Sequence, residues 1–319
     1  MRKNLNRWLK RFLNFCYNIY HMKKVILVAG ATGNLGSKIC SALIKKDARV
    51  IALVRAASDP EKIEGLKKTG VTVAEVDFDH IDEIAAACKE VNCVVSAVAG
   101  LHEVVVDLQK NILHGALQAG VARFIPSDFC TDYNPLVPGE NRNFDLRRTF
   151  KEYLDGTAIQ ASSIFNGAFA DILKYNTPVL NLKNNSVSYW GDKAEWKLDF
   201  TTMDDTAAFT AEVALDDEAP RNLHIASFQI SPVMISAEVQ QISGKNFSLQ
   251  QTGSMEDFAA FIKKQRADHP AGETELYAKW QQSQYLYSMF STHHNELSNG
   301  RYANLNWTTA SAYLKTFVK

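Results

Sequence analysis

A glycine-rich segment between a strand-like and a helix-like stretch offers the first candidate chemistry. It directly follows the apolar run 25–29 and reads Gly30-Ala31-Thr32-Gly33-Asn34-Leu35-Gly36. The first glycine permits a tight turn, the second lets the backbone approach a pyrophosphate, and the third lets helix and strand pack closely. The N–H groups at the helix start would face the phosphates. We therefore predict a dinucleotide loop made by Gly30, Thr32, Gly33, Asn34, Leu35 and Gly36. The alternative is a glycine-rich turn without a ligand.

The end of the second apolar run predicts which dinucleotide would bind. An acidic side chain about 20 residues past the glycines would accept a hydrogen bond from the ribose 2′-OH of NAD. Here the chain places Arg55 after residues 50–54, followed by Ser58. The planar guanidinium of Arg55 suits a 2′-phosphate, and Ser58 can support it. The sequence therefore favours NADP(H), with a solvated surface arginine as the alternative.

Further cofactor contacts are expected where the later strands end. Asp77 ends the third strand and is a candidate for the adenine edge. Ser96, Ala97 and Val98 follow the fourth strand, and Ser127 follows the fifth. All of them would lie at the carboxyl edge of a parallel sheet, where such folds bind ligands. Plain packing explains Asp77 and the 96–98 segment equally well.

Residues for proton transfer are harder to identify. A tyrosine and a lysine one helical turn apart would share a face, and the ammonium would lower the phenol pKa. The pairs Tyr20 with Lys24 and Tyr189 with Lys193 have this spacing, but neither falls in a helical pattern, so we interpret both as chance matches. Tyr133 and Asn166 are expected near the nicotinamide because they follow the fifth and sixth strands. The histidines are scattered and the His293-His294 pair lacks acidic or cysteine partners at ligand spacing, so no metal site is predicted.

These candidates require an α/β scaffold. Strand-like and helix-like stretches alternate from residue 25 to about 126, which predicts a Rossmann-type doubly wound parallel sheet. The expected strands are 25–29, 50–54, 71–76, 93–97 and 123–126. The expected helices are 34–46, 60–68, 80–89 and 104–119. We assign residues 22–155 to an NAD(P)-binding Rossmann domain. Residues 156–319 should form mainly a smaller, irregular α+β substrate domain, with some segments returning to the sheet. In that half we expect a hairpin over 186–200 and helices over 204–213, 234–242, 255–266 and 277–290.

Composition restricts partners and compartment. Lysine plus arginine equals aspartate plus glutamate at 35 each, so no nucleic-acid partner is expected. The five cysteines form no C-x-x-C pair, and no stretch is long and apolar enough to span a bilayer. A cytoplasmic protein with a small-molecule substrate is expected, and its oligomeric state stays open. Residues 1–21 have the pattern of a basic amphipathic helix. This segment could be a secretory signal, a membrane-surface anchor or, as the preferred interpretation, a loose extension.

Four segments resemble one known family. They are the glycine loop, the strand ending in Arg55, the run Val121-Ala122-Arg123-Phe124-Ile125-Pro126-Ser127-Asp128-Phe129, and Asn166-Gly167-Ala168-Phe169. Together they are similar to the NmrA-like and isoflavone-reductase-like family of atypical short-chain dehydrogenase/reductases, and the likeness runs from about Met22 to the C-terminus. The resemblance implies NADP(H) binding, two lobes and a substrate cleft near the end of the fifth strand.

The resemblance also bears on catalysis. The isoflavone-reductase branch has Phe-Asp-x-Lys after the Pro-Ser segment, where the lysine handles the proton; here the matching stretch ends in Arg147. Arg147 could stabilise an oxyanion but cannot act as a general base, and a purely structural arginine is the alternative. We therefore expect an NADPH-dependent reductase of a small aromatic or quinone-like compound, with Arg147, Tyr133 and Asn166 as catalytic candidates. The alternative is a non-catalytic NADP(H) sensor that reports to a protein partner. A sugar-nucleotide epimerase is weaker, because it would need the Tyr-x-x-x-Lys pair.

Overall fold

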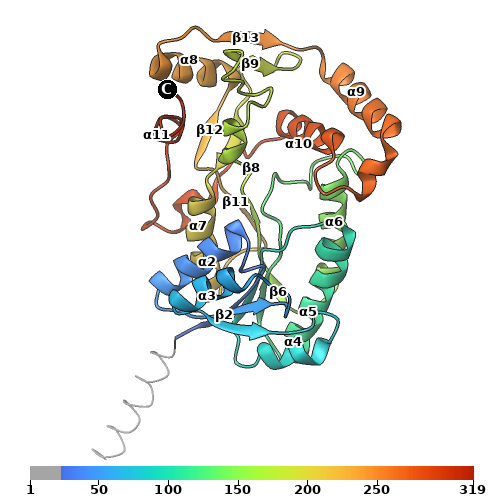
Figure 1. Cartoon of the computed structure of the whole chain (residues 1–319), viewed down its shortest axis with the longest axis vertical. Helices are drawn as coiled ribbons and strands as arrows, with labels where there is room; N and C mark the ends of the chain where they lie inside the picture. The colour runs from blue at the N-terminus through green and yellow to red at the C-terminus, as the bar shows by residue number, and fades with distance from the viewer. Residues whose placement is uncertain (1–22) are drawn as a thin grey trace, which may run out of the picture.

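The structure is a computed structural model that describes residues 23–319, so the helix predicted for residues 1–21 lies outside the described residues. Figure 1 shows two lobes, one blue to green and one mostly yellow to red. We call residues 23–165 together with 203–225 the sheet lobe, and the other residues of 166–319 the cap lobe. The central parallel sheet lies in the sheet lobe, and the smaller three-stranded sheet lies in the cap lobe.

Six parallel strands form the central sheet, in the order β3-β2-β1-β4-β5-β6. They are β1 (Val25–Ala29), β2 (Arg49–Val54), β3 (Thr72–Glu75), β4 (Cys93–Ser96), β5 (Arg123–Ile125) and β6 (Gln160–Ala161). The chain order reverses between β1 and β4. In such sheets the crevice beyond the carboxyl ends of these two strands is the usual ligand site. The predicted Rossmann-type α/β class is confirmed.

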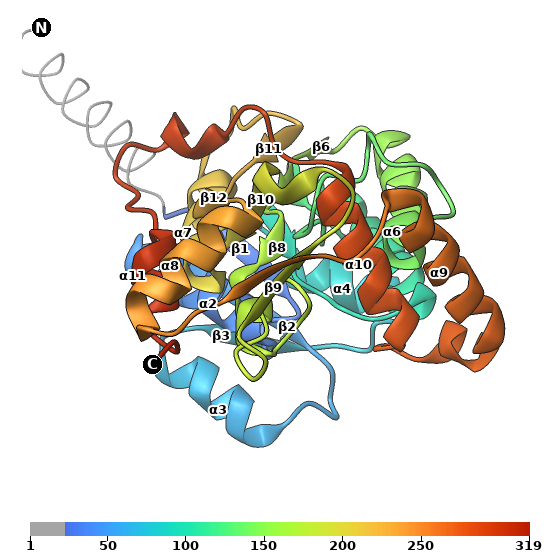
Figure 2. The ribbon, with the colours of Figure 1, turned by 90° about the horizontal axis from the view of Figure 1, so that it is seen from above.

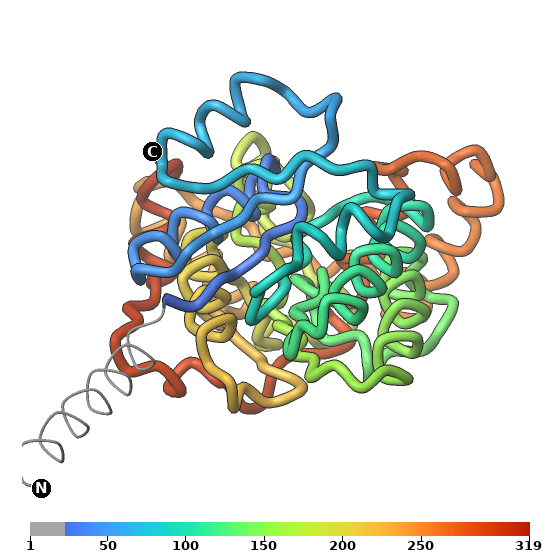
Figure 3. Tube along the Cα trace, turned by 90° about the horizontal axis from the view of Figure 1, so that it is seen from below, coloured from blue at the N-terminus to red at the C-terminus, as the bar shows by residue number. Residues whose placement is uncertain are grey.

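Helices cover both faces of this sheet, and β1 shows why. Its five residues are all buried, and alternate side chains enter two separate cores. The core containing Ile26 and Val28 is covered by α2 (Asn34–Lys45), α3 (Pro60–Lys68) and α7 (Met203–Leu215). The core containing Leu27 is covered by α4 (Ile81–Ala87), α5 (Gln109–Gln118) and α6 (Arg142–Asp155). Figure 3 shows the teal and green helices grouped on one side of the blue strands and the gold α7 on the other.

The first half differs from the sequence prediction in two helices. The helix expected over 104–119 begins as a π-helix, η1 (Glu103–Leu108), and continues as α5. Helix α6 was not predicted, because its sequence is mostly polar and its buried residues include Arg142 and Asn143. Its N-cap is Asn141, whose side chain accepts a hydrogen bond from the N–H of Phe144 at 3.3 Å. Both helices border the carboxyl edge of the sheet and so shape the candidate site.

The second half contributes to both lobes. Helix α7 packs beside α2, and β11 (Asn222–His224) extends the sheet lobe by pairing with β7 (Ser163–Phe165). The cap lobe has a three-stranded sheet made of β8 (Ala168–Phe169), β10 (Leu198–Thr201) and β12 (Phe228–Ile230). A second pair joins β9 (Ser186–Tyr189) to β13 (Ser248–Gln251). The cap lobe helices, seen from above in Figure 2, are α8 (Pro232–Ser243), α9 (Met255–Asp268), α10 (Lys279–Ser291) and α11 (Ala310–Leu314). Four shorter helices complete it: η2 (Ala170–Lys174), η3 (Lys193–Glu195), η4 (Pro270–Thr274) and η5 (Ser298–Arg301).

The hairpin predicted over 186–200 is wrong, although two strands do form there. Strand β9 pairs in parallel with β13, and β10 pairs with β12 and β8. Gly191 adopts a positive φ of 58°, and its N–H donates to the carbonyl of Gly253 at 2.7 Å. This turn fixes the chain to the segment after β13, so β9 and β10 do not meet.

A buried arginine joins β5 to α7. Arg123 is 2% exposed, and its Nη1 donates to the carbonyl of Val213 at 2.7 Å near the end of α7. Replacing Arg123 with alanine should lower the free energy of unfolding by about 3 kcal/mol, because buried carbonyls lose their donor. Urea denaturation measures this change. The control is Arg49→Ala, which removes an exposed pair with Glu90 and should cost less than about 1 kcal/mol. Equal losses in the two variants would contradict the proposed role of Arg123.

Candidate functional site

The glycine turn lies at the carboxyl end of β1 and is too tightly packed for side chains at two of its glycines. Gly30 has a positive φ of 77°, and a Cβ there would lie 2.5 Å from the carbonyl oxygen of Ala97. A Cβ on Gly36 would lie 2.1 Å from the carbonyl oxygen of Gly30. At Gly33 the nearest atom to a Cβ is this same oxygen, at 3.2 Å, and the residue is otherwise exposed. The side of the turn that faces the protein is therefore filled, and the side at Gly33 is accessible to solvent.

The start of α2 leaves backbone donors free on that open side. Gly33 is the N-cap and has no side chain to cap the helix, and the first turn contains no acidic residue. Within residues 23–319, the N–H groups of Asn34, Leu35 and Gly36 have no acceptor. Together with the helix dipole, these donors suit an anion such as a pyrophosphate. A turn that a Cβ would fill, beside unpaired amides, fits the phosphates of a dinucleotide.

A cavity of about 570 Å³ lies at the ends of β2 and β3, and β2 is the neighbour of β1 in the sheet. Arg55, Asp77 and Phe78 line it, and the Arg55 guanidinium lies 5.8 Å from the centre of the Phe78 ring. Glu103, Val104 and Asp107 of η1 form the opposite wall. The structure thus brings Arg55 and Asp77 together, as the sequence predicted. Ser58 is not a lining residue of this cavity; its N–H donates to the carbonyl of Arg55 at 3.0 Å.

The segments after β4 and β5 are tied together by internal hydrogen bonds. The Ser127 hydroxyl donates to the carbonyl of Val98 at 2.6 Å, and the Ser127 N–H donates to Oε1 of Gln109 at 2.9 Å. Ala97 touches the glycine turn, as described above. Ser96 is completely buried, and its Oγ has no partner within the described residues. Ser127 therefore shapes the site from within, because its hydroxyl is already used.

Arg147 lies in the second turn of α6 and links that helix to the loop after β5. Its Nε donates to the carbonyl of Ser127 at 3.1 Å, and its Nη1 donates to the carbonyl of Asn143 at 3.0 Å. Nη2 of Arg147 has no hydrogen-bond partner among residues 23–319, and it is accessible to solvent. Although burial lowers the pKa of Arg147, the nearby Cys130, Tyr285 and Asp128 raise it above its usual value. Arg147 therefore stays cationic, with one donor free.

Two other catalytic candidates are completely buried. Tyr133 is 0% exposed, packed between the rings of Phe144 and Phe165, and burial raises its pKa above the usual value. Asn166 is also 0% exposed and donates to Oγ1 of Thr206 at 3.3 Å. A catalytic role for Tyr133 at an open surface does not fit this burial. Neither residue presents its side chain at an open surface.

The remaining tyrosine and lysine pairs do not form a catalytic motif in the described chain. Tyr189 ends β9 and Lys193 begins η3, so a turn separates them and they share no helical face. Tyr20 lies outside the described residues.

Sequence reasoning missed one polar cluster. Nε2 of His224, at the end of β11, lies 2.8 Å from Oδ2 of Asp132, in the loop after β5. The His294 ring lies 4.8 Å from the His224 ring. These residues are far apart in the sequence, so spacing could not reveal them; only the position of Asp132 after the fifth strand was a signal. Within residues 23–319 no group of three such side chains could hold a metal ion.

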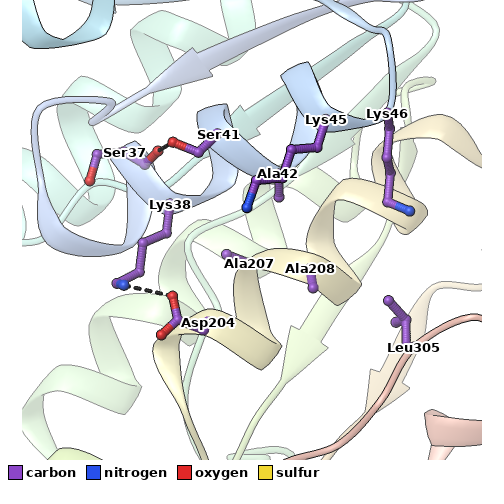
Figure 4. Close-up of a pocket in the computed structure, with 10 residues that line it drawn as sticks. All are labelled: Ser37, Lys38, Ser41, Ala42, Lys45, Lys46, Asp204, Ala207, Ala208 and Leu305. Atoms are coloured by element: carbon purple, nitrogen blue, oxygen red, sulfur yellow. Dashed lines mark hydrogen bonds and ion pairs between the residues drawn. The ribbon is translucent and has the colours of Figure 1, made fainter. Parts of the chain in front are cut away.

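A second cavity, of about 490 Å³, lies between α2 and α7 and is shown in Figure 4. Lys38 in this cavity pairs with Asp204 across the two helices at 2.6 Å. None of the predicted site residues lines it.

Among residues 23–319 no helix has the length and apolar character needed to cross a membrane.

Comparison with known proteins places the chain in a family. The NmrA-like family matches residues 22–314. Pinoresinol reductase 2 of Arabidopsis thaliana is 27% identical over 317 residues, which cover 93% of this chain and 98% of the relative. The structure of AtPrR2 with NADP+ and (+)pinoresinol has a TM-score of 0.78 and 24% identity, covering 93% of this chain and 99% of that chain. That of the NADPH-dependent quinone oxidoreductase QOR2 from Escherichia coli, complexed with NADPH, has a TM-score of 0.69 and 21% identity, covering 91% and 99%. Because the family match spans nearly the whole chain, the protein belongs to the NmrA-like family.

Proposed function

We propose that this protein is an NADPH-dependent reductase whose acceptor is a small aromatic or quinone-like compound. The observation that carries the proposal is the position of two features at neighbouring strand ends of one sheet edge. The open glycine turn with its unpaired amides follows β1, and the cavity that Arg55 lines lies at the end of β2, which pairs directly with β1. A phosphorylated dinucleotide matches this pairing, because the amides suit a pyrophosphate and the guanidinium suits a 2′-phosphate.

Each part of the cofactor has a candidate contact. Gly30, Thr32, Gly33, Asn34, Leu35 and Gly36 would hold the pyrophosphate. Arg55 would bind the 2′-phosphate, with Ser58 on the same turn, and Asp77 would lie near the adenine. Ala97 and Val98 would line the path toward the nicotinamide, and the buried Ser96 and Ser127 would support it from within. When bound, NADPH would supply the hydride, and the chain would supply position and charge.

The acceptor class is supported by the relatives and by Arg147. The named relatives act on pinoresinol or quinones, which are aromatic or conjugated compounds with oxygen atoms. A reduction of such compounds places negative charge on oxygen. The free Nη2 of the permanently charged Arg147, beside the loop after β5, is suited to stabilise that charge.

The proposal is tested by following NADPH oxidation against a panel of quinones and aromatic ethers or ketones. Saturable turnover with at least one acceptor, faster with NADPH than with NADH, is the expected result. Tight NADPH binding without turnover by any acceptor would instead favour a sensor of the NADP(H) pool.

A substitution at Arg147 separates its charge from its packing. Replacing Arg147 with methionine should lower kcat about tenfold and leave the affinity for NADPH unchanged, because one partly exposed donor to the oxyanion is lost. Steady-state kinetics and nucleotide binding measure the two quantities. Lys151→Met on the same helix, whose ammonium pairs with Asp155 at 2.6 Å, is the matched control. A similar kcat for the two variants would remove Arg147 from the reaction.

A further inference from the structure

A histidine and an aspartate from different elements meet at the carboxyl edge of the sheet lobe. His224 ends β11, and its register partner on β7 is Phe165, so the two side chains lie on the same face. Their rings stack at 5.4 Å with an angle of 19°. Asp132 comes from the loop that starts at the end of β5, five residues after Ser127. The pair therefore lies beyond the end of β5, the strand that Ser127 follows.

The two ring nitrogens of His224 have different surroundings. Nε2 is 2.8 Å from the Asp132 carboxylate, so it donates its hydrogen there. Nδ1 has no partner among residues 23–319 and, unlike Nε2 of His294, is not shielded from solvent. The His224 side chain is 30% exposed. An imidazole held through one nitrogen and open at the other is the arrangement that a proton donor needs.

Other titratable residues lie near His224. Burial raises the pKa of Asp132, but the interactions with His224 and the hydrogen bonds from Asn134 together outweigh this and leave the pKa below its usual value. The His294 ring lies next to the His224 ring, and burial lowers the pKa of His294. Asp199 lies behind it, with Oδ2 at 3.8 Å from Nε2 of His294, and His293 packs on Trp196. Asp132 is thus the only carboxylate within residues 23–319 that directly bonds His224.

The other polar groups near the strand ends are poor proton donors. Arg147 stays cationic, and Tyr133 is fully buried with its pKa raised. Asp128 is fully buried as well and accepts a hydrogen bond from Ser163 at 2.7 Å. A reduction that adds a hydride still needs a proton, so a partly exposed acid at this edge would complete the reaction.

We propose that His224, held by Asp132, is the proton donor of the reduction. This inference rests on the proposed function. In the balanced step, the acceptor gains a hydride with its two electrons from the reduced nicotinamide. Its oxygen gains the proton from Nδ1 of His224, and solvent then returns a proton to Nδ1. Asp132 keeps the hydrogen on Nε2 throughout and acts as a positioning residue.

Kinetics with two variants test the donor role. His224→Gln should lower kcat at least about tenfold and remove the decline of kcat as pH rises through the imidazole pKa. Asp132→Asn should move that decline to lower pH, because the imidazolium loses its anionic partner. His114→Gln is the control, since His114 lies on α5 against Tyr153 and far along the helix from the strand ends. NADPH affinity should be unchanged in all three variants.

A second readout needs no turnover. Nitrogen-15 NMR of the nucleotide-free protein should show the neutral His224 ring with its hydrogen on Nε2, and a lower pKa for this ring in Asp132→Asn. If His224→Gln keeps both kcat and the pH profile, the donor role is wrong and the proposed function still stands. A neutral His224 ring with its hydrogen on Nδ1 would likewise overturn the donor role alone. If the wild-type protein reduces no acceptor, the proposed function fails and the donor role fails with it.

Discussion

Replacing Arg55 with alanine is expected to weaken NADPH binding by about 10- to 100-fold, the loss that follows from removing a charge-assisted contact to phosphate. NADH lacks the 2′-phosphate, so its affinity should change less than about threefold. Arg55 is exposed at the mouth of the 570 Å³ cavity and touches only the Phe78 ring among the described aromatic residues. Truncation should therefore leave the fold intact. Fluorescence titration with each nucleotide measures the two affinities.

The matched control is Arg49→Ala. Arg49 is an exposed arginine at the opposite end of the same strand, β2, and pairs with Glu90. It should leave both affinities unchanged. If Arg55→Ala weakened NADPH and NADH equally, the assignment of Arg55 to the 2′-phosphate would be wrong, even if the crevice still bound a dinucleotide.

The largest loss of cofactor binding is expected from Gly36→Ala. A methyl group there would lie 2.1 Å from the carbonyl oxygen of Gly30 and 3.0 Å from the Cα of Ala31. Both are backbone atoms, so the turn itself must move away from α2, and the amides no longer converge on one point. We expect affinity for either nucleotide to fall by more than about 100-fold, which is roughly 3 kcal/mol. Calorimetric titration with NADPH and NADH measures the loss.

Gly65→Ala gives the same chemical change without the clash. Gly65 lies in α3, and a Cβ there would meet nothing within 4 Å. This variant should bind NADPH normally and gain up to about 1 kcal/mol of stability from its helix propensity. Normal nucleotide binding by Gly36→Ala would show that the turn is not the phosphate site.

The first half of the fold was predictable because its signals are local. Strands β1, β2, β4 and β5 are largely buried and have apolar sequences, and the glycine turn lies where a Rossmann sheet requires it. Arg55 and Asp77 could be placed in one cavity because parallel strands end at one edge of the sheet. The helices expected around residues 204–213, 234–242, 255–266 and 277–290 also form, as α7 to α10.

The rest depends on contacts between distant residues. Strand β9 could not be assigned to β13 from sequence, because the pairing is set by Gly191 and Gly253 in two separate turns. Burial removed Tyr133 from the surface of the site, since Phe144 and Phe165 enclose it from two elements. His224 and Asp132 are separated by 92 positions, so only the folded chain brings them together.

The most direct test of this account is a calorimetric titration of the wild-type chain with NADPH and, separately, NADH. The account predicts saturable binding of one NADPH per chain, clearly tighter than that of NADH. An absence of binding heat with both nucleotides, with crystals soaked in NADPH that show no density at the glycine turn, would contradict it.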